Sequence, residues 1–378
     1  MTLDLAKVRA DVKIRGMDIG LFRGVWPLDG WDYRRKVTIT EQSGNDLTDY
    51  QVLVELDSSN FDFTHAQSNG EDVRFTDIEA NLLDYWIEEW DSVAESAKIW
   101  VKVPYILANS TTEIYMYYGN PSASSESDAS ATFIRVIDGL VGSWHLDEGS
   151  GDIAYDSSGN NNDGTLINSP QWVDGKFGKA LEFNGVTNYV NVPDDDTLDI
   201  TDEITLEIWM KPDVAQSGEV NQPVGKHCYV LNYDHPDPAF RGSIGIKSGD
   251  TWYNSGGPLS ISSGEWHHFV GVYDGTYLKT YLDGVEELSN NIGSVTINVE
   301  TSSFMIGANP YENSESPENY FDGVVDEVRV YNKSLNGEEI SDLYNNYGYT
   351  TENYPGKVLV RKYTSPEPSV SVGEEETS

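Results

Sequence analysis

The stretch from Gly264 to Val285, GEWHHFVGVYDGTYLKTYLDGV, constrains the fold of this chain more than any other. Its residues from Trp266 to Tyr273 alternate in side-chain character, which is the period-two pattern of a β-strand. Asp274-Gly275 then has the residues typical of a hairpin turn with positive φ. Residues 277–282, rich in aromatic and β-branched side chains, predict the return strand, and Asp283-Gly284 predicts the turn that ends it. Two Asp-Gly turns so close together predict a meander of antiparallel strands.

Length and composition agree with a β-protein of two domains. The chain has 378 residues, which is enough for two domains with sizeable cores, and it contains 23 Tyr, 10 Trp and 34 Gly. Ring-bearing residues favour strands and glycines favour turns, so the mixture indicates all-β sandwiches rather than helical bundles. The single cysteine, Cys228, excludes a disulfide within the chain.

The charge balance is strongly acidic. Lys and Arg number 24 against 63 Asp and Glu, for a formal charge of −39. Phosphate would be repelled, so we expect no nucleic-acid partner. Two interpretations remain open: a heavily hydrated surface adapted to salty surroundings, and the binding of cations.

The first sandwich is predicted between residues 30 and 120. Six short strands are separated by Ser, Gly, Asn and Asp turns, a pattern typical of a β-sandwich of about 100 residues. The segments WDYRRKVTI, NDLTDYQVLVEL, EDVRFTD, YWIEEWD, KIWVKVP and IYMYYGNPSA resemble a family of unknown function found in archaeal and bacterial surface proteins. This resemblance covers most of residues 30–133 and implies no established activity.

The second sandwich is predicted between residues 139 and 348. The segments GLVGSWHLDEGSGD, QWVDGKFGKALEFNG, EITLEIWMKP, GEWHHFVGVYDG and FDGVVDEVRVYNKSL follow one another in the order seen in the laminin G-like, concanavalin A-like jelly roll, which the chain therefore resembles. Near its end, residues 336–344 predict a short helix with Ser334 or Asn336 as its cap.

The remaining segments complete the predicted organisation. Residues 1–29 form an N-terminal arm, which is either a loose terminus or an anchor for a partner, and residues 121–138 form a small, polar linker. Residues 349–363 contain one more strand, and residues 364–378 are expected to be a disordered acidic tail. The fold class is thus all-β, with two tandem sandwiches.

A calcium site is the first candidate for chemistry. The loop from Asp147 to Asp163, DEGSGDIAYDSSGNNND, can offer side-chain and backbone oxygens in a tight curve, as hard cations require, although an ordinary turn cluster would look the same. In the resembling jelly-roll family a calcium ion often lies where this region meets the last strand. Carried over to this chain, the resemblance implies a structural calcium at Asp147, Asp156 and Asp326.

Catalytic motifs are absent from the sequence. His267 and His268 are neighbours on one strand, so they point to opposite faces and cannot chelate one ion together. His145, His227 and His235 show no metal-ligand spacing either. The related sandwich glucanases carry an E-x-D-x-E run, and the strand EITLEIWM has no such run, so we expect a protein that is not an enzyme.

Glycan binding is the second candidate. Sugars offer CH faces for stacking and hydroxyls for hydrogen bonds, so their sites combine aromatic platforms with amides and carboxylates. Three predicted loops, residues 226–241, 250–258 and 309–320, carry such residues. The candidates are Tyr233, His235, Trp252, Tyr253, Tyr311 and Tyr320.

Adhesion or display is the function that these features favour. The first residues lack the apolar core of a secretory signal, and no stretch is long and apolar enough to cross a membrane. The leading hypothesis is a structural protein on the surface of a virus particle, a tail fibre, spike or capsid decoration, with virion proteins or a second copy as partners and a host-surface glycan as ligand. The alternatives are an extracellular or cell-surface carbohydrate-binding adhesin and, third, a glycoside hydrolase.

Overall fold

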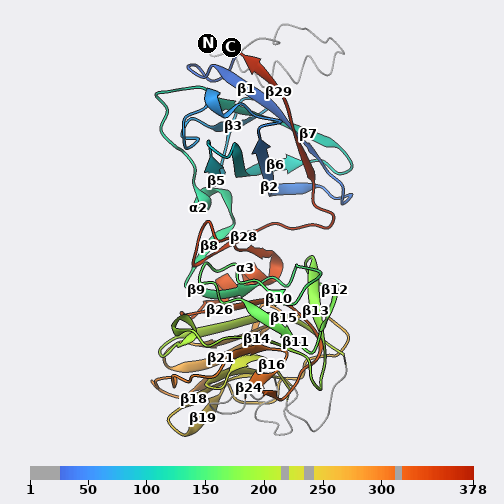
Figure 1. Cartoon of the computed structure of the whole chain (residues 1–378), viewed down its shortest axis with the longest axis vertical. Helices are drawn as coiled ribbons and strands as arrows, with labels where there is room; N and C mark the ends of the chain where they lie inside the picture. Colours follow the sequence, from blue (N-terminus) through green and yellow to red (C-terminus); the bar gives the residue numbers. More distant parts are fainter. Residues whose placement is uncertain (1–25, 214–220, 234–241, 311–316) are drawn as a thin grey trace, which may run out of the picture. The chain divides into compact units, whose positions relative to one another are not determined.

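The computed structural model describes residues 26–213, 221–233, 242–310 and 317–378. Their regular structure is almost entirely β-strand and they divide into two compact units, so the predicted all-β fold is confirmed (Figure 1). Unit 1 comprises residues up to 134 together with residues 361–378, and unit 2 comprises residues 135–360. Most of the predicted N-terminal arm, residues 1–25, lies outside the described residues. No helix in the described ranges has the length and apolarity needed to cross a membrane.

Unit 1 is a sandwich of two antiparallel sheets. The first has the strand order β29-β1-β7-β3-β4 and the second the order β2-β6-β5. The strands are β1 (Tyr33–Thr40), β2 (Leu47–Asp57), β3 (Arg74–Asp77), β4 (Leu82–Leu83), β5 (Tyr85–Asp91), β6 (Ser96–Ile106), β7 (Thr111–Tyr118) and β29 (Ser369–Thr377). A short 3-10 turn, η1 (Phe63–His65), and a single helical turn, α2 (Ala129–Thr132), complete it. Apolar residues of both sheets, among them Val37, Val54 and Phe75, form one buried core.

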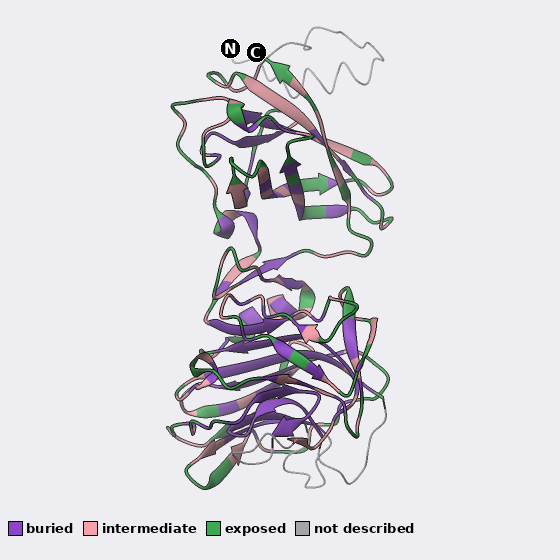
Figure 2. Cartoon of the chain, viewed as in Figure 1, coloured by how far each residue is buried: buried purple, intermediate pink, exposed green. Residues whose placement is uncertain are grey.

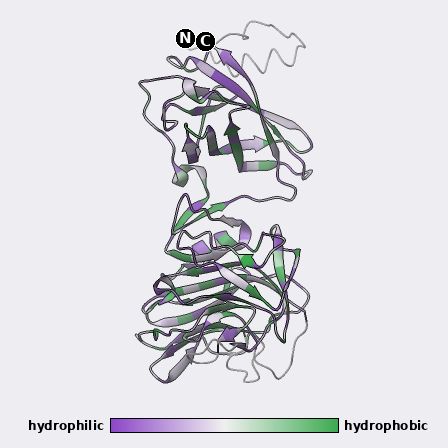
Figure 3. Cartoon of the chain, in the orientation of Figure 1, coloured by the Kyte–Doolittle hydropathy of each residue, from purple (hydrophilic) through white to green (hydrophobic). Residues whose placement is uncertain are grey.

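The prediction of a disordered tail at residues 364–378 is wrong. Residues 369–377 form β29, which pairs antiparallel with β1 along its length, with Val372 opposite Val37 and Val370 opposite Ile39. The strand is hydrophilic over much of its length (Figure 3), which is why composition alone suggests disorder. Its two valines nevertheless pack against the core of unit 1. Unit 1 is therefore completed by the end of the chain, and unit 2 is inserted before its last strand.

The predicted linker, residues 121–138, is only partly irregular. The Asp128 side chain caps α2 by accepting hydrogen bonds from the amides of Ser130 and Ala131, and Phe133 is buried. Residues 135–138 form β8 (Arg135–Asp138), which already belongs to unit 2. The irregular connection is thus shorter than composition suggests.

Unit 2 is a two-sheet jelly roll. One sheet, here called the Trp252 sheet, has the order β10-β11-β14-β23-β16-β17-β18-β19, and the other, here called the His268 sheet, has the order β12-β13-β26-β15-β20-β21-β22 with β9 beside β26. The strands of the Trp252 sheet are β10 (Ile153–Ala154), β11 (Gly164–Ile167), β14 (Tyr189–Val192), β16 (Asn221–Lys226), β17 (Tyr229–Tyr233), β18 (Ser243–Ser248), β19 (Thr251–Asn254) and β23 (Phe304–Ile306). The strands of the His268 sheet are β9 (Leu140–Trp144), β12 (Gln171–Asp174), β13 (Lys179–Asn184), β15 (Ile204–Pro212), β20 (His267–Tyr273), β21 (Tyr277–Leu282), β22 (Val285–Asn291) and β26 (Asp322–Tyr331).

The strands predicted from the Gly264–Val285 stretch are β20 and β21, which lie between β15 and the edge strand β22 in the His268 sheet. Leu231, Ile244 and Phe269 lie in the core between the two sheets. Figure 2 shows that many of the strands of this unit are buried. The His268 sheet is covered on its outer face by a second apolar cluster, in which Ile340 and Leu343 of α3 (Gly337–Asn345) join residues of β8 and β28 (Lys357–Arg361).

The helix α3 begins after Asn336, one of the two predicted cap residues. Asn336 is its N-cap and accepts hydrogen bonds from the backbone N–H groups of Glu338 and Glu339, while the Glu339 carboxylate accepts one from the Asn336 backbone N–H. Smaller elements complete unit 2: η2 (Asp196–Leu198), β24 (Asn309–Pro310) paired with β25 (Pro317–Glu318), and β27 (Tyr347–Tyr349) in a three-stranded sheet with β28 and β8.

Candidate functional site

Trp252 is the exposed aromatic residue of the Trp252 sheet. It lies on β19, the edge strand, directly opposite Lys247 of β18. Because side chains alternate along a strand, and Tyr253 packs against the core, Trp252 points to the outer face of the sheet. Its side chain is 38% exposed. One large ring is therefore presented to solvent on a rigid strand.

Polar groups surround this ring. His227 meets Trp252 edge-on, with ring centroids 6.0 Å apart. Glu300 lies 3.2 Å from His227 and 3.3 Å from the Lys247 ammonium. Burial alone would raise the pKa of Glu300, but the hydrogen bonding and charges of His227 and Lys247 hold it below its ordinary value. His227 and Glu300 are buried, so beside the exposed indole only the Lys247 ammonium is partly open to solvent.

Gly245 extends the patch along the sheet. A side-chain carbon at this position would lie 3.2 Å from the Asn232 amide nitrogen and 3.6 Å from the Trp252 ring. Gly245 is buried, and the absence of a side chain lets the Asn232 amide and the indole approach this strand closely. We call Trp252, His227, Lys247, Glu300 and Gly245 the Trp252 patch.

The other predicted glycan contacts lie elsewhere. Tyr233 is 3% exposed, belongs to the core and meets Phe321 edge-on, so it has no face to offer a sugar. Tyr253 packs against the same core, and Tyr320 is half-buried against Tyr189. His235 and Tyr311 lie outside the described residues. The structure therefore leaves Trp252 as the exposed platform among the described candidates.

Asp147 and Asp326 meet at one loop, residues 175–178, between β12 and β13. Asp326 Oδ2 accepts the backbone N–H groups of Lys176 at 2.8 Å and Phe177 at 3.0 Å, and Asp147 Oδ1 accepts that of Lys179 at 2.6 Å. The other oxygen of Asp326, Oδ1, is buried and accepts no hydrogen bond. An orphaned buried carboxylate oxygen is costly unless a cation or a proton sits on it.

Further oxygens converge on the same loop. A side-chain carbon at Gly175 would lie 2.5 Å from Asp326 Oδ2, 2.6 Å from the Lys179 carbonyl oxygen and 2.8 Å from that of Phe177. Burial, together with the negative charges of Glu327 and Asp147, raises the pKa of Asp326 well above its ordinary value, and burial likewise raises the pKa of Asp147. Two carboxylates and neighbouring carbonyls are the donor set that calcium prefers, so these residues fit the ion.

Asp156 does not join this cluster. Its carboxylate accepts hydrogen bonds from the amides of Ser143, Ser158 and Asn162 and from the Ser158 hydroxyl, which use both oxygens to hold its own loop. Across the ranges that the structure describes, no three His, Cys, Asp or Glu side chains gather with metal-binding spacing. A calcium ion at Asp147 and Asp326 would therefore depend on backbone carbonyls for its other ligands.

The strand β15, which contains most of the EITLEIWM sequence, holds its inner glutamate away from solvent. Glu207 of β15 is fully buried, bound to Arg329 at 2.9 Å, His268 at 3.0 Å and the Tyr331 hydroxyl at 2.6 Å. Burial alone would raise the pKa of Glu207, yet these three partners lower it to about 2. This carboxylate stabilises the sheet from within and has no access to a sugar.

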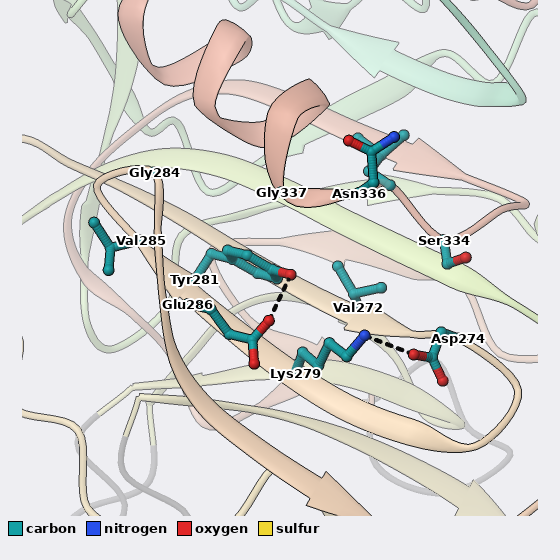
Figure 4. Close-up of a pocket in the computed structure, with 11 residues that line it drawn as sticks. Val272, Asp274, Lys279, Tyr281, Gly284, Val285, Glu286, Ser334, Asn336 and Gly337 are labelled. Atoms are coloured by element: carbon teal, nitrogen blue, oxygen red, sulfur yellow. Dashed lines mark hydrogen bonds and ion pairs between the residues drawn. The ribbon is translucent and has the colours of Figure 1, made fainter.

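A pocket that the sequence does not reveal lies beside the start of α3 on the His268 sheet (Figure 4). Its volume is about 640 Å³. The Tyr281 hydroxyl donates to Glu286 at 2.9 Å, and Lys279 pairs with Asp274 at 2.7 Å. Tyr281 is only 5% exposed, so the polar groups satisfy one another and no ring face is open. The Trp252 patch is the better platform for a ligand.

Two family models match the chain. The model described as the concanavalin A-like lectin/glucanases superfamily, of the laminin G type, matches residues 184–341, and a domain of unknown function (DUF2341) matches residues 69–147. The predicted resemblance to both families is thereby confirmed. A comparison with curated protein sequences found no match.

Three solved structures are similar to part of this chain. Domain 4 of AbnA, an extracellular arabinanase from Geobacillus stearothermophilus, solved in complex with arabinotriose, is 22% identical over 55% of this chain and 98% of that one, with a TM-score of 0.42. The binding domain of Paraclostridial Mosquitocidal Protein 1 is 19% identical over 55% and 52%, with a TM-score of 0.44. The receptor binding domain of botulinum neurotoxin mosaic serotype C/D is 14% identical over 55% and 52%, with a TM-score of 0.42. The match spans about half the length of the two toxin chains.

Proposed function

We propose that this chain is a glycan-binding protein displayed on an exterior surface, and that its ligand stacks on Trp252. The observation that carries the proposal is an exposed indole on an edge strand, beside a half-buried ammonium, Lys247, which the buried Glu300 carboxylate holds in place. An aromatic face meets the CH groups of a sugar ring, and the ammonium beside it hydrogen-bonds a sugar hydroxyl. The family to which the domain belongs includes lectins.

The charged groups of the Trp252 patch suit a neutral sugar. Lys247 and His227 share one carboxylate, Glu300, so donors and acceptor lie close together without a net charge of one sign. A hydroxyl is both a donor and an acceptor, and it can bind between such groups. An anionic ligand would instead require an excess of cationic side chains, which the patch lacks.

A glycan array followed by calorimetry on the best ligand tests the proposal. Trp252→Ala should weaken binding about tenfold or more, because loss of ring burial and stacking removes about 1 to 3 kcal/mol. Tyr277→Ala is the matched control, since Tyr277 is 39% exposed and lies on a strand of the other sheet. Equal loss in both variants, or unchanged binding by Trp252→Ala, would refute the assignment of the ligand to this patch.

We propose that the surface on which the protein is displayed is that of a virus particle rather than that of a cell. The test is deletion of residues 1–25. The described chain begins at Trp26, whose indole donates to the Trp31 carbonyl at 2.6 Å and meets Tyr117 edge-on at 5.8 Å. With Trp26 retained, the deletion should leave the melting of both units unchanged and abolish particle docking or self-association. Intact assembly would favour a free adhesin.

We further propose that Asp147 and Asp326 bind a structural calcium ion. The orphaned Asp326 Oδ1 and the raised pKa values of both carboxyl groups support it, because a cation would relieve the repulsion that burial enforces. The ion would fasten the loop at residues 175–178 to β26. Its role there is structural, and the Trp252 patch lies on the other sheet.

A further inference from the structure

Ser262, His267 and Asp283 form a hydrogen-bonded chain. Ser262 Oγ lies 2.7 Å from His267 Nε2, and His267 Nδ1 lies 2.9 Å from Asp283 Oδ2. The imidazole is 8% exposed, whereas Ser262 is exposed in the segment that precedes β20. A serine that solvent can reach is thus backed by a histidine and a carboxylate in series.

The hairpin between β20 and β21 creates this arrangement. Their register pairs Phe269 with Leu282, which places the Asp283-Gly284 turn beside His267 at the start of β20. Asp283 has φ 50° and Gly284 φ 80°, the positive values of the turn predicted from the Asp-Gly sequence. Asp283 Oδ1 also accepts the backbone N–H of His268 at 2.9 Å, so its carboxylate is fixed at both oxygens.

The tautomer of His267 follows from its partners. An ionised Asp283 can only accept hydrogen bonds, so Nδ1 carries the proton and donates it to Oδ2. Nε2 is then a lone pair that accepts the hydroxyl proton of Ser262. This is the orientation in which an imidazole acts as a general base toward a serine.

We propose that Ser262 is an activated nucleophile that takes the acyl group of small, accessible esters. Ser262 Oγ forms a bond to the ester carbonyl carbon while His267 Nε2 takes the hydroxyl proton; the imidazolium then returns that proton to the departing alcohol as the C–O bond breaks. Water, deprotonated by the same nitrogen, then attacks the acyl carbon; the bond to Ser262 Oγ breaks, the imidazolium returns the proton to that oxygen, and the acid is released. Asp283 is the positioning residue of this chain. Among the described residues, the backbone N–H groups of Ser262 and Ser263 donate no hydrogen bond within the protein, so they are available to the oxyanion.

A second set of hydrogen bonds of the same kind shows why the exposure of the hydroxyl matters for reaction with a substrate. Thr350 Oγ1 lies 2.7 Å from His145 Nε2, and His145 Nδ1 lies 3.0 Å from Glu327. Thr350 is only 4% exposed and so cannot meet a substrate, and this chain serves the packing of unit 2. Ser262 differs in its exposure. It also has a competing acceptor, Glu265 Oε2 at 3.3 Å, which is the longer of its two contacts.

Labelling of the full chain with a fluorophosphonate tests the proposal, because the probe reports nucleophilic serines without requiring the natural ester. Ser262 Oγ would bond to phosphorus, fluoride would leave, and the proton would pass to His267. Peptide mass spectrometry should find the label on Ser262, at a rate about 100-fold above Ser263, since a general base contributes roughly 10²- to 10⁴-fold. Ser263 is the matched control, exposed and adjacent but without these contacts.

Variants separate reactivity from folding. Ser262→Ala should abolish labelling and the release of nitrophenol from p-nitrophenyl acetate, while glycan binding at the Trp252 patch and the melting midpoint stay unchanged. Asp283→Asn should slow labelling at Ser262, and Glu265→Gln should preserve or raise it by removing the competing acceptor. His267→Gln should also slow labelling at Ser262. If that variant lowers the melting midpoint, its loss of labelling is ambiguous, and Ser262→Ala and Glu265→Gln then test the reactivity of Ser262 on their own. Equal labelling of Ser262 and Ser263, or none at Ser262 in the folded protein, would overturn the proposal and leave the glycan assignment untouched.

Discussion

Glu375 Oε2, close to the C-terminal end, accepts a hydrogen bond from the buried Tyr118 hydroxyl at 2.7 Å and lies 3.0 Å from His65 Nδ1. The last strand of the chain is thereby fastened to the first unit. Since unit 2 is inserted before this strand, the completion of unit 1 depends on residues that follow the whole of unit 2. The consequence can be measured in the stability of unit 1.

Glu375→Ala should destabilise unit 1 by about 1 to 3 kcal/mol, because it removes a hydrogen bond to a charged group and leaves the Tyr118 hydroxyl without its acceptor. Glu374→Ala, on the exposed neighbour in the same strand, should change stability by less than about 0.5 kcal/mol. Denaturant unfolding followed by domain-resolved hydrogen exchange measures both. A chain ending at residue 363 should lose more, and a normal unit 1 in that truncated chain would contradict the role assigned to β29.

Calcium should stabilise unit 2 and leave unit 1 unchanged. An ion that binds only the folded state adds about 2.7 kcal/mol at a hundredfold excess over its dissociation constant. Asp326→Asn and Asp147→Asn should remove the difference in melting between calcium and chelator, whereas Asp174→Asn, on an exposed residue of the same region, should retain it. An unchanged midpoint with chelator, together with no metal by elemental analysis, would disprove the site.

The same carboxyl groups fix the direction of a pH effect. Their pKa values are raised in the folded state, so in the absence of metal their contribution to stability is present below the ordinary pKa and is lost as the pH rises through the folded values. Calcium requires both groups ionised and therefore competes with these protons. Calcium affinity should weaken on acidification, as titration calorimetry at several pH values would show.

Much of the fold of unit 2 is predictable from local patterns. The alternation in residues 266–273, the Asp-Gly turns and the Asn336 cap each act over a few residues, and the structure confirms β20, β21 and α3. β29 escaped prediction because the apolar contribution of Val370 and Val372 is small and their pairing partners lie on β1, at the other end of the chain. The composition of a segment indicates how hydrophilic the segment is, but it cannot show that the segment pairs with a strand far away in the sequence.

The candidate site was less predictable, for a related reason. Tyr233 and Trp252 look equivalent in sequence, yet one faces the core and the other faces solvent, which depends on the register of β17, β18 and β19. Asp147 and Asp326 are far apart in sequence, and the family resemblance, rather than any local spacing, suggested them. Ser262 carried no signal, since its contact with His267 matters only once Asp283 lies behind that imidazole.

Stability should rise with salt. At a formal charge of −39, exposed carboxylates repel one another, and the Debye length falls from about 10 Å at 0.1 M to about 3 Å at 1 M. The melting midpoint should therefore increase between these concentrations of sodium chloride, a salt chosen to limit Hofmeister effects. A flat or falling midpoint would indicate that the acidic surface serves cation binding rather than adaptation to salt.

Glu207 should make unit 2 sensitive to acid. Its pKa is lowered to about 2 by Arg329, His268 and Tyr331 against the effect of burial, so its contribution is present above the ordinary pKa of 4.5 and is lost as the pH falls from there toward 2. A shift of this size corresponds to about 3 kcal/mol at neutral pH. The free energy of unfolding of unit 2, measured with saturating calcium, should fall as the pH is lowered from about 5 to about 2.

Glu207→Gln separates this carboxylate from all others. The variant should lose about 3 to 5 kcal/mol at pH 7, because Arg329 is left as a buried charge with one carboxylate fewer, and its unfolding free energy should fall less steeply with acidification than that of the unmodified chain. Glu287→Gln, on an exposed residue of β22, is the control and should keep both the stability and the slope. If Glu207→Gln instead retained the full acid slope, the acid sensitivity would have to arise from other carboxylates, and the buried ion pair would contribute to packing alone.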